Sequence, residues 1–413
     1  MTASSPADTA APVPDDAQAR RNVIILAAAS ALLGAQMPVH FVLGGLSGQL
    51  LAADKSFSTL PISATVFCSM LSAPLIALLM GRFGRRAGFL LGSFGGALGA
   101  AINVVALMIG SFSLLLAGSA LVGVYMAAQG QYRFAAADTA SAAYRPKAIS
   151  LVMAGGLMAA ILGPQIIVPL FSDALAPISF AGAYVAVVFL NLLAAPILLF
   201  LDIPRPRRRK KGESSGRPMR EILANPRIRV AIICAMVSYA LMNLVMTATP
   251  LAVVGCGFSV DMAGSVVMLH VIAMFAPSFF TGHLIVRFGA ERIVITGLLL
   301  LGLTAVVATS GVTSYHFFIA LILLGLGWNF GFIGATDMLT SCHEPEERAK
   351  VQGLNDFLVF GMVTIASLSS GMLLNGFDTV VAGWNAVNYA VVPFLTFAGA
   401  ALIWLRIRRR AAA

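Results

Sequence analysis

Polar and aromatic side chains recur inside stretches of the sequence that are otherwise apolar, most of them at helical spacing. Neighbours three or four residues apart lie on one face of a helix. Because a polar side chain inside a membrane is costly, it usually faces a cavity or another helix. We therefore take nine residues as candidate substrate contacts: Gln36, His40, Tyr125, Gln129, Tyr132, Tyr239, Asn243, Trp328 and Asn329.

These candidates are amides, phenols, an indole and an imidazole, with few charges among them. Amides can bond ring N–H and C=O groups while Trp and Tyr rings stack, so the set suits a small polar solute with an aromatic ring. A sugar would use the same groups and stays an alternative. Each residue could instead only hydrogen-bond between helices. His40 could carry a proton or act as a neutral hydrogen-bonding group.

No catalytic or phosphate-binding motif accompanies these residues. The sequence has no metal-ligand spacing, no G-x-x-x-x-G-K-[ST] phosphate loop and no G-x-S-x-G elbow. The four cysteines (Cys68, Cys234, Cys256 and Cys342) show no pairing pattern and are expected to pack as small apolar residues. We expect no enzyme activity, no transport driven by ATP hydrolysis in this chain, no cofactor and no metal.

The elements that hold the candidate residues are predicted to be membrane-spanning helices. Of the 413 residues, 59% are hydrophobic and 11% are charged, whereas soluble domains have about a half and about a quarter. A span needs about 20 apolar residues, so the apolar blocks predict an all-α membrane protein with twelve spans. Their approximate bounds are 22–46, 57–80, 87–109, 112–136, 147–171, 178–201, 228–252, 260–285, 291–310, 315–339, 350–374 and 384–405.

The basic residues predict the orientation of these spans. If the N-terminus is cytoplasmic, every lysine and arginine except Lys55 falls in a cytoplasmic segment, as the positive-inside rule requires. Both termini are therefore predicted to be cytoplasmic. The basic run from Asp202 to Arg229 could attract nucleic acid or anionic lipid. Beside a membrane span it is better explained as an orientation signal and tether, and we expect no nucleic-acid partner.

The chain is predicted to consist of two related halves. Arg82 and Arg287 each precede Phe-Gly and are 205 residues apart, and Arg145 and Arg348 are 203 apart. Such offsets predict pseudo-symmetric six-helix bundles, a transporter architecture. The predicted parts are a disordered cytoplasmic tail (1–21), an N-terminal six-helix bundle (22–201), a basic cytoplasmic linker (202–227), a C-terminal six-helix bundle (228–405) and a basic cytoplasmic tail (406–413).

The stretch from Ala77 to Arg86, ALLMGRFGRR, resembles the loop signature G-x-x-x-D-R-x-G-R-R of the major facilitator superfamily. Ala77 and Gly81 replace its first Gly and its Asp, and Val286 replaces the Asp of the second copy. The resemblance covers essentially the whole chain. It implies secondary transport of a small-molecule substrate by alternating access, with spans 1, 4, 7 and 10 around a central cavity. It also implies a multi-pass protein of a bacterial cytoplasmic membrane, and we expect it to function as a monomer in the lipid bilayer.

Two further stretches, Gln129 to Asp138 and Gly327 to Thr340, are similar to a bacterial subgroup of the superfamily associated with riboflavin uptake. Uptake of a riboflavin-like solute is therefore the favoured function. Proton-coupled efflux of drugs or metabolites is an alternative, because Gly155 to Pro169 resembles part of a Gly-Pro motif of antiporters. Ser119, where such antiporters usually carry an Arg, weakens it. A membrane receptor or scaffold without net flux is the alternative of another class.

Charged residues at the predicted cytoplasmic side suggest a gate. With both signature aspartates missing, Asp138 and Asp356 are expected to supply the counter-charge to the loop arginines. Alternatively these charges are solvated topology signals, since exposed ion pairs contribute only about 0–1 kcal/mol. The predicted gate consists of Arg82, Arg85, Arg133, Asp138, Arg287, Asp337 and Asp356.

Overall fold

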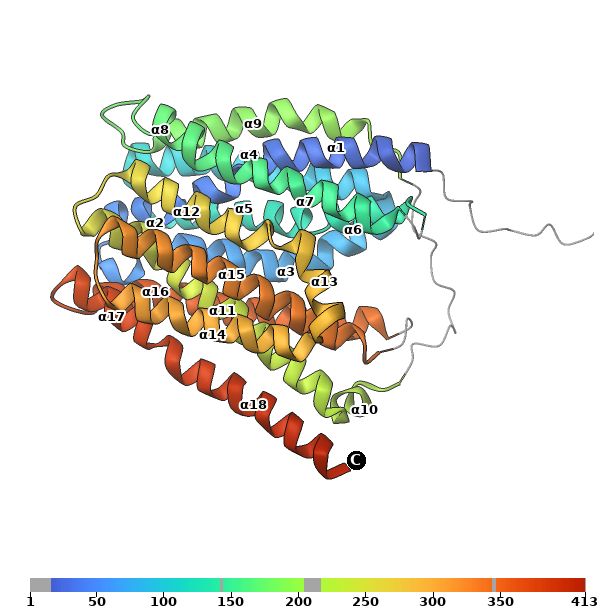
Figure 1. The fold of residues 1–413 in the computed structure, drawn as a ribbon. Coiled ribbons are helices and arrows are strands. Elements are labelled where there is room, and N and C mark those ends of the chain that lie inside the picture. Colours follow the sequence, from blue (N-terminus) through green and yellow to red (C-terminus); the bar gives the residue numbers. More distant parts are fainter. Residues whose placement is uncertain (1–15, 142–143, 204–216, 344–346, 413) are drawn as a thin grey trace, which may run out of the picture.

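The computed structural model describes residues 16–141, 144–203, 217–343 and 347–412, and these residues form only helices and turns. The helices run roughly parallel in one bundle (Figure 1). Eleven are long and apolar enough to cross a membrane, or twelve when α12 and α13 are counted as one bent span. The prediction of an all-α membrane protein is confirmed.

The N-terminal half contains the first six spans, several of which are interrupted. Its elements are α1 (Asp16–Gly34), α2 (Gln36–Leu51), the 3-10 turn η1 (Lys55–Phe57), α3 (Leu60–Phe83), α4 (Arg85–Ile109), α5 (Phe112–Gln129), α6 (Tyr132–Asp138), α7 (Arg145–Leu162), the π-helical turn η2 (Gly163–Ile167), α8 (Val168–Phe171) and α9 (Ala181–Leu199).

The C-terminal half contains longer helices. Its elements are α10 (Met219–Ala224), α11 (Pro226–Gly255), α12 (Val260–Phe275), α13 (Ser278–Phe288), α14 (Ala290–Thr309), α15 (Ser314–Thr340), α16 (Arg348–Asn375), α17 (Val380–Tyr389) and α18 (Val391–Ala412).

The outermost helices extend beyond the predicted spans. Helix α1 begins at Asp16, inside the predicted tail 1–21, and α18 continues through the predicted tail 406–413 to Ala412. The helical parts of these tails, 16–21 and 406–412, contain no Gly or Pro that would stop a helix. Both are rich in Ala and Arg, which favour helix formation. Residues 1–15 of the tail and 204–216 of the linker lie outside the described residues.

Proline accounts for the break in the first span. Pro38 has no N–H to donate to the carbonyl of Gly34, and the helix is interrupted between Gly34 and Gln36. The fifth span holds Pro164 in its π-helical turn, and Pro277 separates α12 from α13, which are bent by 41°. These breaks free backbone groups in the middle of the bundle, where side chains must satisfy them.

The repeated Arg-Phe-Gly signature has the same conformation in both halves. Gly84 ends α3 at φ 91° and Gly289 ends α13 at φ 85°, which is a region that glycine adopts without strain. The guanidinium of Arg82 lies 5.1 Å from the ring of Phe83, and that of Arg287 lies 5.2 Å from the ring of Phe288. The internal repeat seen in the sequence is therefore also a repeat of local structure.

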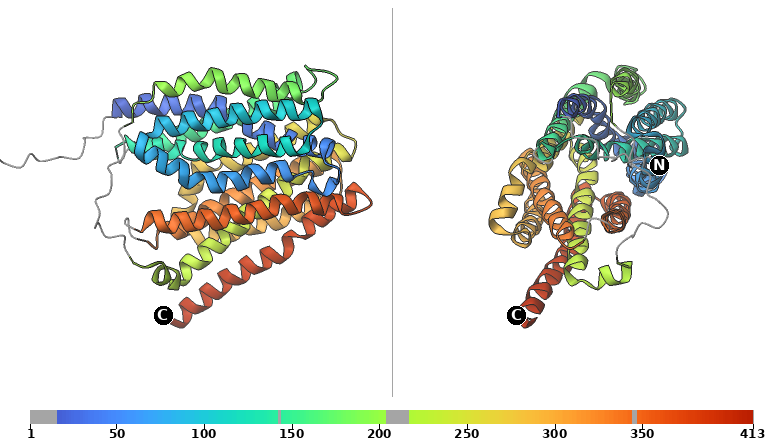
Figure 2. Two further views of the ribbon diagram at one scale, coloured as in Figure 1. Left: turned by 180° about the vertical axis from the view of Figure 1, so that it is seen from behind. Right: turned by 90° about the vertical axis from the view of Figure 1, so that its right-hand side faces the viewer.

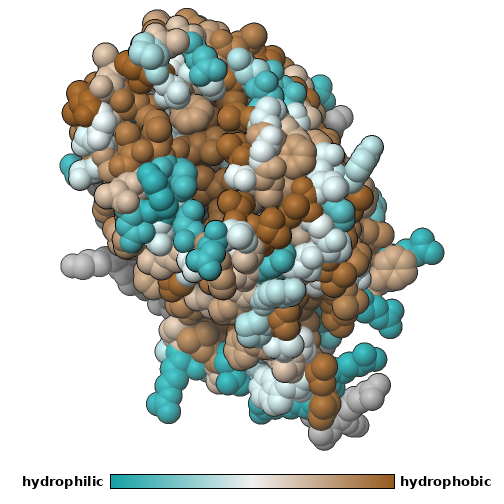
Figure 3. Space-filling view, turned by 90° about the vertical axis from the view of Figure 1, so that its left-hand side faces the viewer, coloured by the Kyte–Doolittle hydropathy of each residue, from teal (hydrophilic) through white to brown (hydrophobic). Residues whose placement is uncertain are grey.

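Two ends of the bundle can be distinguished. The linker end carries the first described residue, both described edges of the linker, and the C-terminus (Figure 1). The opposite, loop end carries the turns that follow α2, α8, α11 and α16. Figure 3 looks onto this end, where hydrophilic groups gather in patches over a largely apolar surface.

The two halves are joined at the loop end. Thr59 donates to the carbonyl of Ser367 at 2.8 Å, and Asn375 donates to the carbonyl of Lys55 at 2.8 Å. Gln165 of the π-helical turn donates to Ser265 at 2.8 Å. Figure 2 shows α3 beside α16, and Ser63 of α3 donates to Ser367 of α16 at 3.0 Å. Every cross-half hydrogen bond with both partners described lies toward the loop end.

Candidate functional site

A cluster of five aromatic rings lies inside the C-terminal half, and we call it the aromatic cluster. Tyr239 of α11 contacts Trp328, Phe332 and Phe360 edge-to-face, with centroid separations of 5.4, 5.2 and 5.7 Å. Trp328 and Phe332, one turn apart on α15, are stacked at 5.3 Å with an interplanar angle of 11°. Phe275 of α12 meets Trp328 at 5.8 Å. The five rings thus come from four helices, α11, α12, α15 and α16.

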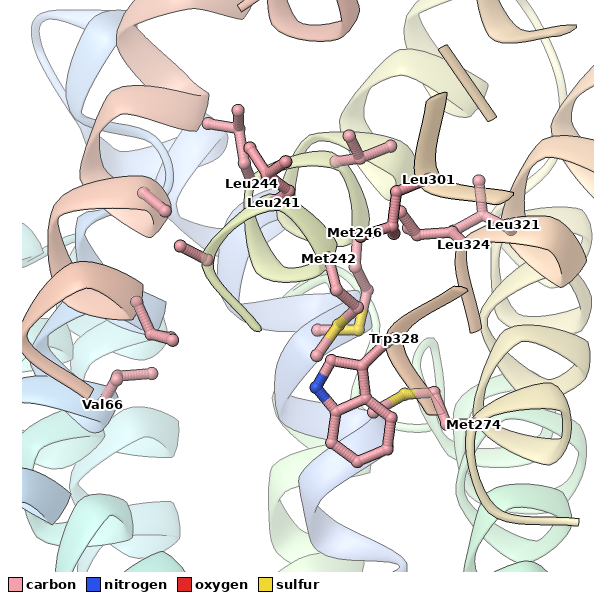
Figure 4. Packing of buried hydrophobic residues seen from close by; sticks show 14 of the residues in the cluster. Val66, Leu241, Met242, Leu244, Met246, Met274, Leu301, Leu321, Leu324 and Trp328 are labelled. Carbon is pink, nitrogen blue, oxygen red and sulfur yellow. The ribbon is translucent and has the colours of Figure 1, made fainter. Parts of the chain in front are cut away.

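Trp328 carries a polar group that the described protein leaves unused. Its side chain is 6% exposed, and among the described residues no acceptor bonds its Nε1–H. In Figure 4 the indole lies beside Met242, Met246 and Met274, with its nitrogen edge turned away from Met274. A buried donor without a partner costs about 1–3 kcal/mol. A ligand with a carbonyl or ring-nitrogen acceptor would remove that cost.

Asn329, the next residue, faces a different part of the structure. It donates to the carbonyl of Met274 at 2.6 Å and to Ser278 at 2.8 Å, and it accepts from Thr281 at 2.7 Å. These bonds tie α15 to the bend between α12 and α13. Consecutive helical residues point about 100° apart, so Trp328 and Asn329 cannot share one face. The structure gives Asn329 a role in holding the bend.

Asn243 lies one turn after Tyr239 on α11. It is buried, and its Oδ1 accepts from Thr247 on the same helix at 3.3 Å. The pair predicted from i,i+4 spacing is therefore present on one face. Sequence reasoning missed Phe332, Phe360 and Phe275. Phe332 could have been found, because it follows Trp328 by four residues.

In the N-terminal half, polar side chains bond one another across helices. Gln36 of α2 donates to Oδ1 of Asn191 on α9 at 3.2 Å, and Asn191 donates back to Oε1 of Gln36 at 3.3 Å. A Cβ at Gly96 of α4 would lie 2.6 Å from Gln36 Oε1 and 3.0 Å from Asn191 Oδ1, so a larger residue there would have to displace the paired amides. Asn191 was not among the sequence candidates, although an amide within the sixth apolar span was a visible signal.

His40 is held in the same manner. Its Nε2 lies 2.7 Å from Oγ1 of Thr65, and that hydroxyl also lies 2.7 Å from the carbonyl of Ser119 and 3.1 Å from that of Pro61. When the one hydroxyl proton goes to a carbonyl, the tautomer that fits is the one in which Nε2 of His40 donates to Thr65. Among the described residues, its buried Nδ1 has no hydrogen-bond partner. The arrangement fits a neutral imidazole that joins α2 to α3 and α5.

The three candidates of the fourth span do not share one face. Tyr125 is fully buried on α5, and Gln129 lies half-buried where a Cβ at Gly34 would be 3.0 Å from its Nε2. The helix is interrupted after Gln129, and Tyr132 on α6 packs edge-to-face on Phe89 at 4.7 Å. The expected face assumed an unbroken helix. Gln129 instead lies beside the break in the first span, and Tyr132 packs against α4.

The N-terminal half contains one ion pair of the predicted gate. Nε of Arg85 lies 2.9 Å from Oδ2 of Asp138, with side-chain exposures of 15% and 35%. Nη1 of Arg85 also donates to Gln131 at 3.2 Å. The expected alternative partner, Arg82, is exposed and lies over Phe83 instead. Arg82 lies in the last turn of α3 and Arg85 begins α4, and the turn at Gly84 between them makes the two side chains point in different directions.

The remaining gate candidates are not brought together by a described ion pair. Arg287 is exposed over Phe288, and no carboxylate lies within ion-pair distance of it in the described parts of the chain. Asp337 is exposed near the end of α15, and Asp356 is exposed on α16, where it accepts from Asn355 at 3.2 Å. The side chain of Arg133 lies outside the described residues.

An ion pair that was not predicted joins the linker to the C-terminal half. Arg217 donates from Nε and Nη2 to the two carboxylate oxygens of Glu347, at 2.7 and 2.8 Å, and from its backbone N–H at 2.9 Å. Glu347 precedes α16 and its side chain is 1% exposed, whereas that of Arg217 is 41% exposed. No spacing in the sequence indicates this pair, because 130 residues separate its members.

The known proteins to which this chain is similar in sequence are all described as transporters. A sequence model of the Major Facilitator Superfamily matches residues 22–252 and 231–413. The chain is 44% identical over 400 residues to the riboflavin transporter RfnT of Brucella anthropi, covering 97% of this chain and 99% of the relative. It is 29% identical over 357 residues to YddS of Bacillus subtilis strain 168, an uncharacterised transporter of the same type, covering 83% and 82%.

Solved structures share the fold. A mutant of the nucleoside transporter NupG superposes with a TM-score of 0.75 at 14% identity, covering 94% of this chain and 99% of that one. The transporter FucP in its outward conformation superposes with a TM-score of 0.58 at 15% identity, covering 93% and 98%. At such low identity these structures show that the fold is shared and show nothing about the solute.

Proposed function

The chain belongs to the Major Facilitator Superfamily, and from that premise we propose that it takes up riboflavin, or a solute with a closely similar ring system, by alternating access. Its relative in Brucella anthropi carries the name of a riboflavin transporter and matches nearly the whole chain. The family and the multi-span fold account for movement of a small molecule across a membrane. The solute itself has to be argued from the site.

The unpartnered indole N–H of Trp328 within the aromatic cluster is the observation that carries this proposal. A flavin ring is planar and bears carbonyl oxygens and ring nitrogens at its edge. Aromatic side chains can stack on such a ring while a buried donor bonds its edge. A sugar needs several hydrogen-bonding partners for its hydroxyls, whereas the cluster is aromatic and offers the one unpartnered N–H of Trp328, so we favour an aromatic solute.

We assign the substrate contacts unequally between the halves. Tyr239, Asn243 and Trp328 provide the stacking and bonding surface of the C-terminal half, and Gln129 and Tyr125 face it from the N-terminal half. Gln36 and His40 are already engaged by Asn191 and Thr65, so we expect them to contribute less. Tyr132 and Asn329 are expected to support packing, since their contacts point elsewhere.

The site can be tested with a pair of tryptophan variants. Trp328→Phe keeps a ring and removes the unpartnered donor, so the half-saturation constant for labelled riboflavin should rise roughly 2- to 10-fold. Trp384→Phe is the matched control, because that buried indole donates to the carbonyl of Ala308 at 2.9 Å. It should lower the amount of folded protein and leave the half-saturation constant unchanged.

Uptake should be assayed in cells that can neither make nor import riboflavin. An unchanged constant in Trp328→Phe, or absence of riboflavin uptake by the native chain, would refute the proposal.

We further propose that the linker end is cytoplasmic and the membrane is the bacterial inner membrane. The excess of basic residues in linker-end loops supports this orientation. The cross-half bonds at the loop end then describe a state closed to the outside. A cysteine at Thr379 should react with a membrane-impermeant thiol reagent in whole cells, and a cysteine at Met219 should not. The reverse pattern would require the opposite orientation.

Coupling to protons is expected to be weak. Asp356 is the only acid well inside a predicted span, and it lies near the linker end. Collapse of the proton gradient in vesicles should therefore reduce riboflavin accumulation only in part. Complete loss of accumulation, together with proton uptake on adding riboflavin, would contradict this and implicate His40.

A further inference from the structure

An apolar groove of about 610 Å³ runs along the outside of the C-terminal half. Its floor is α11, and its walls are α16 and the α17–α18 segment. Seen from the linker end in Figure 2, α16 and α18 lie on different sides of α11 and diverge from each other. The lining residues include Ile233 and Leu244 of the floor, and Met362, Met372, Phe394 and Phe397 of the walls. Small side chains keep the groove open, among them Ala240, Ala366, Ser369 and Ala390.

A cationic cluster lies on the same helices nearer the linker end. The guanidinium groups of Arg229 on α11 and Arg408 on α18 lie 5.6 and 5.5 Å from the ring of Trp404. Neither α11 nor α18 contains an aspartate or a glutamate. Within the described parts of the chain, no carboxylate lies within ion-pair distance of either arginine. Two exposed cations are thus held together beside a half-exposed tryptophan, which is typical of the interface between hydrocarbon and headgroups.

The length of the groove and its distance from the cationic cluster match the acyl chain and headgroup of one lipid molecule. Arg229 precedes Ile233 by one helical turn, and the groove follows α11 from Ile233 to Leu244. At 1.5 Å per residue that length is about 16 Å. One leaflet of hydrocarbon is about 15 Å thick. An acyl chain lying in the groove would therefore leave its phosphate at the level of Arg229 and Arg408.

We propose that this groove is a binding site for an anionic phospholipid of the linker-end leaflet. One acyl chain fills the space between α16 and α18, and the phosphate binds Arg229 and Arg408. Two cations without acidic neighbours favour a lipid with net negative charge over a zwitterionic one. Each arginine near an anionic headgroup contributes about fivefold in affinity, the equivalent of about 1 kcal/mol. The site is separate from the aromatic cluster and does not depend on which solute is transported.

Trp404 offers a direct readout of occupancy. Of the three tryptophans, Trp328 and Trp384 are buried, whereas Trp404 is 43% exposed. The purified full-length protein would be placed in phosphatidylcholine nanodiscs that contain a small fraction of brominated phosphatidylglycerol or brominated phosphatidylcholine. Brominated phosphatidylglycerol should quench the fluorescence at several-fold lower content than brominated phosphatidylcholine. The Trp404→Phe variant should lose this difference.

Variants can test the cationic cluster and the apolar groove separately. The double variant Arg229→Gln, Arg408→Gln should bring the two lipids to equal quenching, a loss of roughly 10- to 30-fold in preference. Arg287→Gln is the matched control, because that arginine also lies over a ring but on α13, which does not line this groove. It should keep the preference. Ser369→Phe should narrow the groove and weaken quenching, whereas Ser369→Ala should not.

Several outcomes would overturn the proposal. Equal quenching by both lipids in the native protein would remove the anionic site. A preference that survives the double arginine variant would place the lipid elsewhere. A preference unchanged by Ser369→Phe, in protein that is folded by gel filtration, would show that no acyl chain occupies the groove. Efficient disulfide formation between copies of Ser369→Cys would make a second copy of the chain the occupant. Riboflavin uptake is not measured in any of these experiments, so their failure would leave the transport proposal intact.

Discussion

The two halves share a topology and a glycine signature, yet their candidate residues make different contacts. In the N-terminal half, Gln36 bonds Asn191 and His40 bonds Thr65 through Nε2, while Nδ1 of His40 has no partner among the described residues. In the C-terminal half, five rings converge and leave the N–H of Trp328 without an acceptor in the described protein. The repeated fold therefore holds different contacts in its two halves: an amide and an imidazole that bond neighbouring helices in the first, and a packed group of aromatic rings in the second.

The halves also differ at the linker end. In the N-terminal half the signature loop supplies Arg85, which pairs with Asp138 of the same half. In the C-terminal half the signature arginine Arg287 lies over its neighbouring ring, and the buried Glu347 is paired by Arg217 from the linker. The linker is therefore fastened to the second half, close to the start of α16. Because α16 also bonds α3 at the loop end, the linker is attached to a helix that joins both halves.

The largest expected effect is on substrate affinity in the C-terminal half. Trp328→Ala removes a stacked ring and its donor, so the half-saturation constant for riboflavin should rise about 5- to 150-fold. Gln36→Ala in the N-terminal half should change it less than about threefold, because Gln36 already bonds Asn191. Both are measured as initial uptake rates at equal membrane abundance. If Gln36→Ala raises the half-saturation constant more than Trp328→Ala does, the substrate contacts do not lie mainly in the C-terminal half.

The next effect concerns the linker. A double-mutant cycle with Arg217→Gln and Glu347→Gln should give a coupling energy of about 2 kcal/mol in the detergent-purified protein, since bidentate bonds to a buried carboxylate contribute strongly. The measurement is the free energy of unfolding in a mild denaturant. The exposed Arg220 on α10 is the matched control, and Arg220→Gln should show no coupling to Glu347→Gln. A coupling near zero for Arg217 would mean that the linker is not fastened there.

A smaller effect is expected for the amide pair of the N-terminal half. Gln36→Leu should destabilise the protein by about 1 kcal/mol, because Asn191 loses a partner in the membrane interior. The double variant Gln36→Leu, Asn191→Leu should recover most of this loss, since replacing both partners removes the unsatisfied group. Thermal unfolding followed by gel filtration measures both. A double variant less stable than either single one would contradict the pairing.

The smallest stability effect is expected for the partly exposed pair of Arg85 and Asp138. Arg85→Ala should cost less than about 1 kcal/mol of stability. If the pair acts as a gate, Arg85→Ala and Asp138→Asn should still slow uptake. The exchanged variant Arg85→Asp, Asp138→Arg should regain part of it. Arg82→Ala is the control, because Arg82 lies over Phe83, and its uptake should stay near the native rate. Normal uptake in both Arg85→Ala and Asp138→Asn would make these charges topology signals only.

Much of the fold could be predicted from local sequence because a bilayer imposes local requirements. Each span has to be apolar over a fixed length, so the blocks from 22–46 to 384–405 could be found without any tertiary information. The Arg-Phe-Gly repeat could likewise be found, because a helix that ends at positive φ requires glycine in both copies. Tyr239, Asn243 and Trp328 could be selected because indole, phenol and amide groups are costly in hydrocarbon.

What only the tertiary structure decided is the direction in which each selected side chain points. Trp328 and Asn329 are adjacent in sequence, yet one joins the aromatic cluster and the other holds the bend at Pro277. After the break that follows Gln129, Tyr132 packs on Phe89. Beyond the turn at Gly84, Arg85 forms the ion pair with Asp138, and Arg82 does not. Hydrophobicity fixes that a segment crosses the membrane, but it does not fix the rotation of the helix about its own axis. That rotation depends on close packing between helices and on backbone breaks whose carbonyls need partners, and both involve residues far apart in the chain.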